Sequence, residues 1–140
     1  MRVLASLLLC MAATIAHAQT TPVGLWRTID DNTGTEKSLV RVTESGGVVS
    51  GRIETLLHPS KPNPLCEKCR DERHGKPIVG LPIIEGLKRH GDVWDDGKIL
   101  DPENGKIYTV RLRLLEGGKI LEVRGYLGPF FRTQTWTRVE

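Results

Sequence analysis

Short runs of alternating apolar and polar residues fill the last third of the chain, 98–139, and turn signals separate them. The clearest run is 107–115, where the even-numbered positions are aromatic or apolar and positions 109, 111 and 113 are polar. A period of two residues indicates a half-buried β-strand. Asn104-Gly105 before this run and Gly117-Gly118 after it are typical of tight hairpin turns. The pattern predicts an antiparallel meander.

The rest of the chain extends this pattern, and no stretch of ten or more residues after position 18 has a helical apolar period. An apolar strand is expected at 78–84, bulged or at an edge because of Pro82, and a tight turn at Asp95-Asp96-Gly97. We expect eight to ten short strands and little helix. The other strands are predicted at 24–30, 38–43, 48–57, 93–94, 98–101, 120–127 and 132–139.

Closure of such a sheet removes its unpaired edges. The predicted fold is therefore all-β, a small closed antiparallel up-and-down β-barrel. An open sandwich is the competing architecture.

The first eighteen residues have the pattern of an export signal. Arg2 is followed by the apolar stretch 3–15, which is too short to span a bilayer, and by Ala16-His17-Ala18, a signal-peptidase site. A lipoprotein signal ending at Cys10 is a weaker alternative, because a bulky leucine precedes the cysteine. The predicted organisation is a signal peptide at 1–18 and one β-barrel domain at 19–140, periplasmic or secreted from a bacterium.

Charge and hydropathy narrow the classes of partner. The formal net charge of the chain is +3 and would be +2 after removal of Arg2 with the signal peptide. Acidic and basic residues are interspersed along the chain. That balance does not suit a nucleic-acid-binding surface. No later segment has the length of a transmembrane helix. The oligomeric state is left open.

Residues 58–77, the proline-rich excursion, interrupt the run of strands. Four of the eight prolines lie in it, together with Cys66 and Cys69. A disulfide between these cysteines is favoured, since an exported domain with two cysteines is in an oxidising compartment. A zinc site is a minor alternative, and a thioredoxin-like redox centre is weaker still, because no helix start is expected here. The zinc alternative would use Cys66, Cys69, His58 and His74.

Sequence motifs for catalysis are missing from the chain: it has no G-x-S-x-G, no H-E-x-x-H and no phosphate-binding glycine loop. Acidic residues near turns could serve calcium or acid–base chemistry, but turn formation explains them better. These residues are Asp92, Asp95, Asp96, Asp101 and Glu103. We therefore predict a protein that is not an enzyme and that has no cofactor.

Aromatic and cationic residues gather late in the chain. If Arg132, Gln134 and Trp136 face the barrel interior, the mouth presents a cation, an amide and a flat ring, which suits an amphipathic or anionic ligand. In the competing interpretation the tryptophans plug the core and arginines stack over them. The candidate ligand-binding residues are Trp26, Trp94, Tyr108, Arg124, Tyr126, Arg132, Gln134 and Trp136.

Five segments resemble one uncharacterised bacterial family, domain of unknown function 2147. They are Gly24-Leu25-Trp26, the run 76–81, the D-P-x-N-G-K hairpin within 97–106, Val123-Arg124-Gly125-Tyr126 and the R-T-Q-T-W string at 132–136. The resemblance implies a small exported barrel similar to lipocalins and other calycins, with no established enzymatic activity. The opening G-x-W is similar to that of lipocalins, in which a late arginine lies over the tryptophan. Arg124 and Arg132 are both candidates for that arginine.

Together these features predict an exported lipocalin-like module that binds a small hydrophobic or amphipathic molecule in the barrel mouth without catalysing a reaction. The excursion is expected to roof part of that mouth. The alternative is a cell-envelope protein-interaction module with a filled barrel and no ligand.

Overall fold

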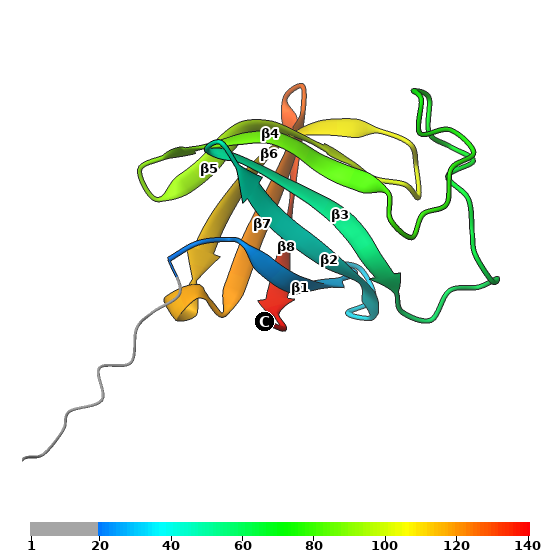
Figure 1. Cartoon of the computed structure of the whole chain (residues 1–140), viewed down its shortest axis with the longest axis horizontal. Coiled ribbons are helices and arrows are strands. Elements are labelled where there is room, and N and C mark those ends of the chain that lie inside the picture. The colour runs from blue at the N-terminus through cyan, green and yellow to red at the C-terminus, as the bar shows by residue number, and fades with distance from the viewer. Residues whose placement is uncertain (1–19) are drawn as a thin grey trace, which may run out of the picture.

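Residues 20–140 are described by the computed structural model, and the predicted signal peptide, 1–18, lies outside the described residues. The described residues form one antiparallel sheet of eight strands, which closes on itself in chain order, as the sequence pattern predicted (Figure 1). Helix in this part of the chain is limited to the 3-10 turn η1 (Glu116–Gly118), and no helix there is long and apolar enough to cross a membrane. The strands are β1 (Gly24–Ile29), β2 (Glu36–Ser45), β3 (Val48–Leu56), β4 (Pro82–His90), β5 (Val93–Leu100), β6 (Ile107–Leu115), β7 (Ile120–Leu127) and β8 (Phe130–Arg138).

Two details of the predicted strands were wrong. The strand expected at 78–84 begins only at Pro82, because a first position in a strand does not require the N–H that proline lacks. The turn expected at Asp95-Asp96-Gly97 is instead a bulge inside β5, with Asp96 at φ 63° and a register shift against β6. A bulge absorbs one extra residue and keeps the strand in the barrel.

Connections between antiparallel neighbours alternate between the two ends of the barrel. The β2–β3, β4–β5 and β6–β7 turns, together with the segment before β1, lie at one end, the closed end. The β1–β2, β3–β4, β5–β6 and β7–β8 connections surround the other end, the mouth. The proline-rich excursion belongs to the β3–β4 connection and runs outside the barrel beside the mouth (green in Figure 1).

Trp26 fills the closed end, where it is fully buried and donates its indole N–H to the Pro22 carbonyl at 2.7 Å. Arg138 lies over the indole ring, 4.3 Å from its centroid. Its guanidinium also donates to the carbonyls of Gly118, Val23 and Thr21 at 2.7, 3.0 and 2.7 Å. The late arginine of this chain is therefore Arg138. The two candidates from the sequence were wrong, since neither lies over the indole.

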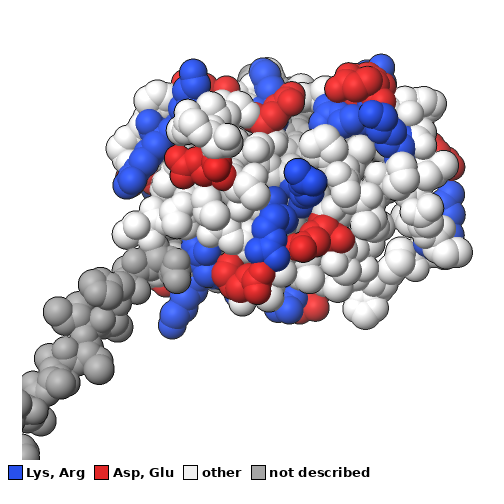
Figure 2. Space-filling view, in the orientation of Figure 1, with Lys and Arg blue, Asp and Glu red and all other residues white. Residues whose placement is uncertain are grey.

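On the face of the molecule shown in Figure 2, charged side chains of both signs are interspersed rather than gathered into a field of one sign. Arg41 on β2, for example, pairs with Glu54 on the neighbouring strand β3 and with the C-terminal residue Glu140. Pairs of this kind are exposed and contribute little to stability. The barrel depends instead on its apolar interior, which is filled at the closed end and hollow at the mouth.

Candidate functional site

A cavity of about 430 Å³ occupies the mouth half of the barrel. Its deep wall is apolar, because inward-facing positions on β3, β4, β5, β7 and β8 carry branched or aromatic side chains. Gly125 contributes to the space, since a side chain there would begin 3.3 Å from the Cβ of Tyr108. The apolar lining includes Ile53, Leu56, Ile83, Ile99, Leu100, Val123 and Trp136.

Two hydroxyl groups interrupt the apolar wall. Thr28 on β1 and Ser38 on β2 are both buried, and their oxygens are hydrogen-bonded to each other at 2.8 Å. Further toward the rim, Trp136 donates its indole N–H to Gln134 at 3.0 Å, and the Asn104 amide donates to the Tyr108 hydroxyl at 3.0 Å. The lining thus passes from apolar in depth to polar at the rim.

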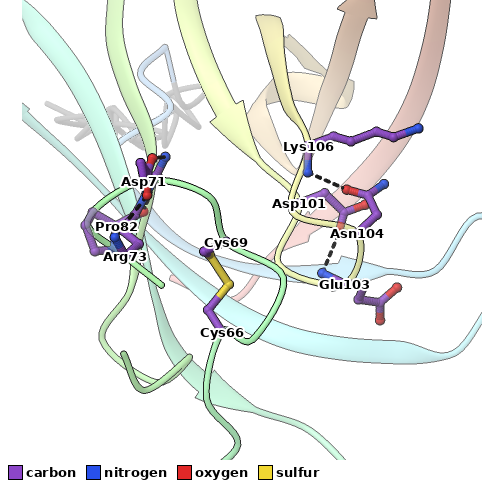
Figure 3. The surroundings of a disulfide bond; sticks show 9 residues. All are labelled: Cys66, Cys69, Asp71, Arg73, Pro82, Asp101, Glu103, Asn104 and Lys106. Carbon is purple, nitrogen blue, oxygen red and sulfur yellow. Dashed lines mark hydrogen bonds and ion pairs between the residues drawn. A yellow bond between two sulfur atoms is a disulfide. The ribbon is translucent and has the colours of Figure 1, made fainter. Parts of the chain in front are cut away.

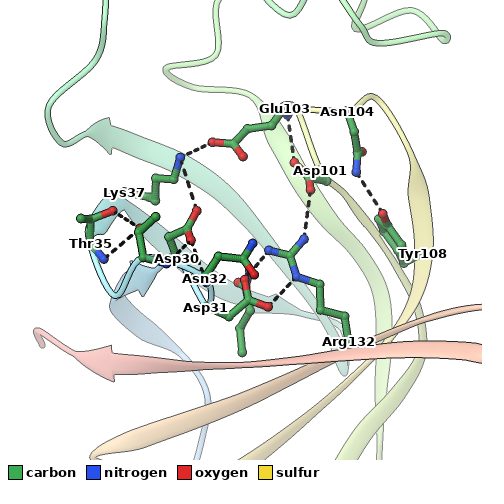
Figure 4. A network of polar contacts seen from close by, with 12 residues as sticks. Asp30, Asp31, Asn32, Thr35, Lys37, Asp101, Glu103, Asn104, Tyr108 and Arg132 are labelled. Carbon is green, nitrogen blue, oxygen red and sulfur yellow. Dashed lines mark hydrogen bonds and ion pairs between the residues drawn. The ribbon is translucent and has the colours of Figure 1, made fainter.

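Ion pairs cross the mouth between two hairpins, β1–β2 and β5–β6, that stand four strands apart in the ring (Figure 4). Arg132 on β8 binds the Asp31 carboxylate, with 2.7 Å between Nε and Oδ2, and also lies 3.7 Å from Asp101. Lys37 contacts Glu103 and lies 3.7 Å from Asp30. The two cations of the rim are therefore matched by four carboxylates.

The protonation preferences of these groups follow from the same contacts. The hydrogen bond from Arg132 lowers the pKa of Asp31 and raises the pKa of Arg132. The hydrogen bond to Glu103 raises the pKa of Lys37, and the backbone N–H groups of Thr33 and Asn32 lower the pKa of Asp30. These contacts therefore favour the ionised forms of Asp30, Asp31, Lys37 and Arg132.

The Asp31 contacts also close a gap in the barrel wall. The β1–β8 ladder contains only the pairs Trp26↔Arg138 and Arg27↔Thr137, both near the closed end. Toward the mouth, Asp31 accepts from Arg132 on β8 and from the Gln134 amide at 3.4 Å. Side-chain contacts therefore join the β1–β2 connection to β8 at the mouth.

The proline-rich excursion forms one side of the cavity through His58, Pro59, Ser60 and Pro64. Cys66 and Cys69 are buried and form a disulfide, which confirms the sequence prediction (Figure 3). The excursion is also hydrogen-bonded to itself, since the Cys66 N–H donates to the Lys76 carbonyl at 2.8 Å and the Gly75 N–H donates to the Cys66 carbonyl at 2.9 Å.

Two contacts fix the excursion to the barrel. The Lys68 carbonyl packs directly on Gly105 in the β5–β6 hairpin, where no side chain could be accommodated. Arg73 is 7% exposed, donates to the Pro82 carbonyl at 2.9 Å and forms an ion pair with Asp71. The excursion is thus a fixed wall of the cavity, bound at both the β4 and the β5–β6 sides.

Acid is expected to loosen this wall through Asp71. The hydrogen bonds from the side chain and backbone of Arg73 lower the pKa of Asp71 from 3.8 to about 2. Because the folded pKa is the lower one, the stabilisation is present above pH 3.8 and is lost as the pH falls from 3.8 to about 2. We expect the amide of Cys66 to exchange roughly five- to tenfold faster in Asp71→Asn than in the wild type at neutral pH.

That ratio of exchange rates is expected to fall through this window and to approach one below pH 2, where most of the wild-type carboxyl is also uncharged. Comparing the two proteins at each pH cancels the intrinsic pH dependence of exchange. A ratio that stays constant through this window would contradict the assigned role of the Asp71–Arg73 pair.

The structure brings together half of the ligand-binding residues expected from the sequence. Tyr108, Arg132, Gln134 and Trp136 line the cavity. The other four do not line it. Trp26 is under Arg138 at the closed end, and Trp94 is buried with Arg89 stacked on it. Arg124 and Tyr126 lie on the outer face of β7, where both contact Phe131.

Sequence reasoning missed the aliphatic lining and two of the four carboxylates of the rim, Asp30 and Asp31. The alternation in β3 and β7 could have identified Ile53 and Val123 as inward positions. Nothing local indicates that Asp31 meets Arg132, because 101 positions separate them.

The alternative zinc site is wrong, because the sulfur atoms of Cys66 and Cys69 are joined to each other and are not thiolates. The five acidic residues named from the sequence do not form one cluster either. Asp101 and Glu103 belong to the ion pairs of the mouth, whereas Asp95 and Asp96 contact His90 on the outside of β4 and β5.

Comparison with solved structures gives a match to protein HP1028 from the human pathogen Helicobacter pylori, which is described as belonging to the lipocalin family. The TM-score is 0.74 at 20% sequence identity, over 87% of this chain and 85% of that chain. At that identity the likeness concerns the fold, which is lipocalin-like. A comparison with curated protein sequences finds no match. A family model described as "Uncharacterized protein conserved in bacteria (DUF2147)" matches residues 24–138, so the chain belongs to this bacterial family, as its motifs predicted.

Proposed function

We propose that the protein is an exported carrier that binds one small amphipathic molecule in the mouth cavity and catalyses no reaction on it. The observation that carries the proposal is the cavity of about 430 Å³, apolar in depth and polar at its rim. Ligand pockets in proteins have volumes of roughly 300 to 1,000 Å³ and this kind of lining. A filled barrel, the alternative from the sequence, does not fit this interior.

Electrostatics of the rim favour a ligand whose polar end is neutral or cationic. The sequence pointed to Arg132 as a partner for an anion, but this guanidinium is already bound by Asp31 and Asp101. A ligand carboxylate would have to displace Asp31 and would face the other carboxylates of the rim. A hydroxyl, an amide or an ammonium group meets no such repulsion.

Export is supported by two independent features. Disulfides such as Cys66–Cys69 persist in oxidising compartments. The pattern of residues 1–18 is typical of a cleaved secretory signal. A periplasmic or extracellular carrier accounts for both features.

Competition binding tests the proposal. The mature chain is titrated with the neutral fluorescent probe N-phenyl-1-naphthylamine, which is then displaced by dodecanol, dodecyltrimethylammonium and dodecanoate below their micelle concentrations. We expect the neutral and cationic amphiphiles to compete roughly tenfold better than dodecanoate. Asp31→Asn frees Arg132 and is expected to improve dodecanoate competition about fivefold to tenfold.

Glu54→Gln is the matched control, because it also removes one carboxylate from an ion pair with arginine but lies outside the cavity. It should leave the ranking unchanged. Absence of probe binding to the wild type would refute the carrier function. A wild-type preference for dodecanoate would refute the proposed class of ligand.

A further inference from the structure

An apolar tip projects from the β7–β8 hairpin at the mouth end of the barrel. Leu127, Phe130 and Phe131 flank the turn at Gly128 and are 43%, 75% and 64% exposed. Ile107, the first residue of the adjacent strand β6, is 43% exposed. None of these four residues lines the mouth cavity. The apolar tip is thus a surface separate from the ligand site.

Cations surround the apolar tip without acidic partners. Arg124 stacks on Phe131, 5.1 Å from the ring centroid, and lies opposite Arg111 in the β6–β7 ladder. Lys106 is exposed beside Ile107. In the part of the chain that the structure describes, Arg124, Arg111 and Lys106 form no ion pair.

Several cations elsewhere on the barrel are matched by neighbouring acids. Arg27 pairs with Glu36, and Arg113 pairs with Glu122. The nearest acids to Arg111 along β5, Asp95 and Asp96, contact His90 instead. Unmatched positive charge and exposed aromatic rings therefore coincide at this one hairpin.

We propose that the apolar tip docks the protein onto an anionic phospholipid surface. Phenylalanine and leucine side chains insert into the boundary between headgroups and acyl chains, and adjacent cations attract anionic headgroups. The turn at Gly128 has Leu127 before it and both exposed rings after it, so the hairpin end presents apolar side chains that can insert between lipids. Docking at the tip would place the mouth next to the membrane, from which an amphipathic ligand can enter or leave.

Vesicle binding tests this proposal. The mature wild-type chain is mixed with vesicles of phosphatidylcholine alone, or of phosphatidylcholine and phosphatidylglycerol in equal parts, and bound protein is measured by flotation. We expect binding to the anionic vesicles only, weakened by high salt. Phe130→Ser is expected to reduce it roughly tenfold, and the double variant Arg124→Gln, Lys106→Gln by a similar factor.

Val79→Ser is the matched control, because Val79 is 45% exposed but lies in the β3–β4 connection, away from the tip. It should bind vesicles as the wild type does. The tip variants should retain binding of N-phenyl-1-naphthylamine, so that failure of docking and failure of the carrier function remain distinguishable. Equal binding to neutral vesicles, no vesicle binding, or a wild-type dimer that Phe130→Ser abolishes would each overturn the proposal.

Discussion

Gly105→Ala is expected to lower the free energy of unfolding by about 3 kcal/mol, a large fraction of the stability of a small domain. Two effects add. The backbone at Gly105 has φ 74°, a conformation that costs alanine about 1 kcal/mol. A Cβ atom there would also lie 1.9 Å from the Lys68 carbonyl oxygen, and overpacking of this kind costs typically 1 to 3 kcal/mol.

The clash cannot be relieved by a side-chain rotation, because the opposing atoms belong to the backbone. Lys68 lies within the short loop closed by the Cys66–Cys69 disulfide, so its carbonyl cannot move alone. Relief requires the whole excursion to shift away from the β5–β6 hairpin. We therefore expect Gly105→Ala to weaken binding of the fluorescent probe as well as stability.

Gly34 offers a matched control within the same fold. Gly34 lies in the β1–β2 connection and has φ 72°. Its N–H donates to the backbone carbonyl of Asp30 at 2.8 Å, just as the Gly105 N–H donates to the backbone carbonyl of Asp101 at 2.8 Å. A Cβ at Gly34 meets nothing within 4 Å. Urea unfolding should therefore give a loss of about 1 kcal/mol for Gly34→Ala. If both variants lose the same free energy of unfolding, the close contact between Gly105 and Lys68 does not contribute to stability.

The comparison of Gly34 with Gly105 also marks the limit of prediction from sequence. Both glycines follow turn residues, and the sequence predicted a strand on each side of both turns. The sequence does not indicate that the second hairpin receives the excursion, because that contact joins segments separated by 37 positions. Turn chemistry is local, whereas the wall of the cavity is built from contacts between distant parts of the chain.

Face assignment was predictable where alternation is regular. In β6 the period of two places Tyr108 and Val110 inside, and in β8 it places Arg132, Gln134 and Trp136 on one face. The electrostatic role of Arg132 was not predictable, since it depends on Asp31 at the other end of the chain. The bulge at Asp96 was interpreted as a turn because the same residue types favour both structures.

Val123→Phe is expected to weaken binding of N-phenyl-1-naphthylamine on the order of a hundredfold. Val123 lies between Leu112 and Gln134 in the ladders and faces the cavity. A phenyl ring there would remove roughly 100 Å² of ligand contact, and at about 25 cal/mol per Å² this amounts to about 2.5 kcal/mol. The ring enters the cavity rather than a region packed with side chains, so the free energy of unfolding should change by less than about 1 kcal/mol.

The same substitution at Val110 tests whether the interior tolerates a larger side chain only where it lines the cavity. Val110 is buried and does not line the cavity, so Val110→Phe should overpack the side chains around it and cost about 1 to 3 kcal/mol in urea unfolding. Thr135→Phe, on the exposed face of β8, should change neither quantity. If Val123→Phe binds the probe as tightly as the wild type, the ligand does not occupy the mouth cavity. If it is as destabilising as Val110→Phe, the cavity is not free to accept a ring, and the carrier function loses the observation on which it rests.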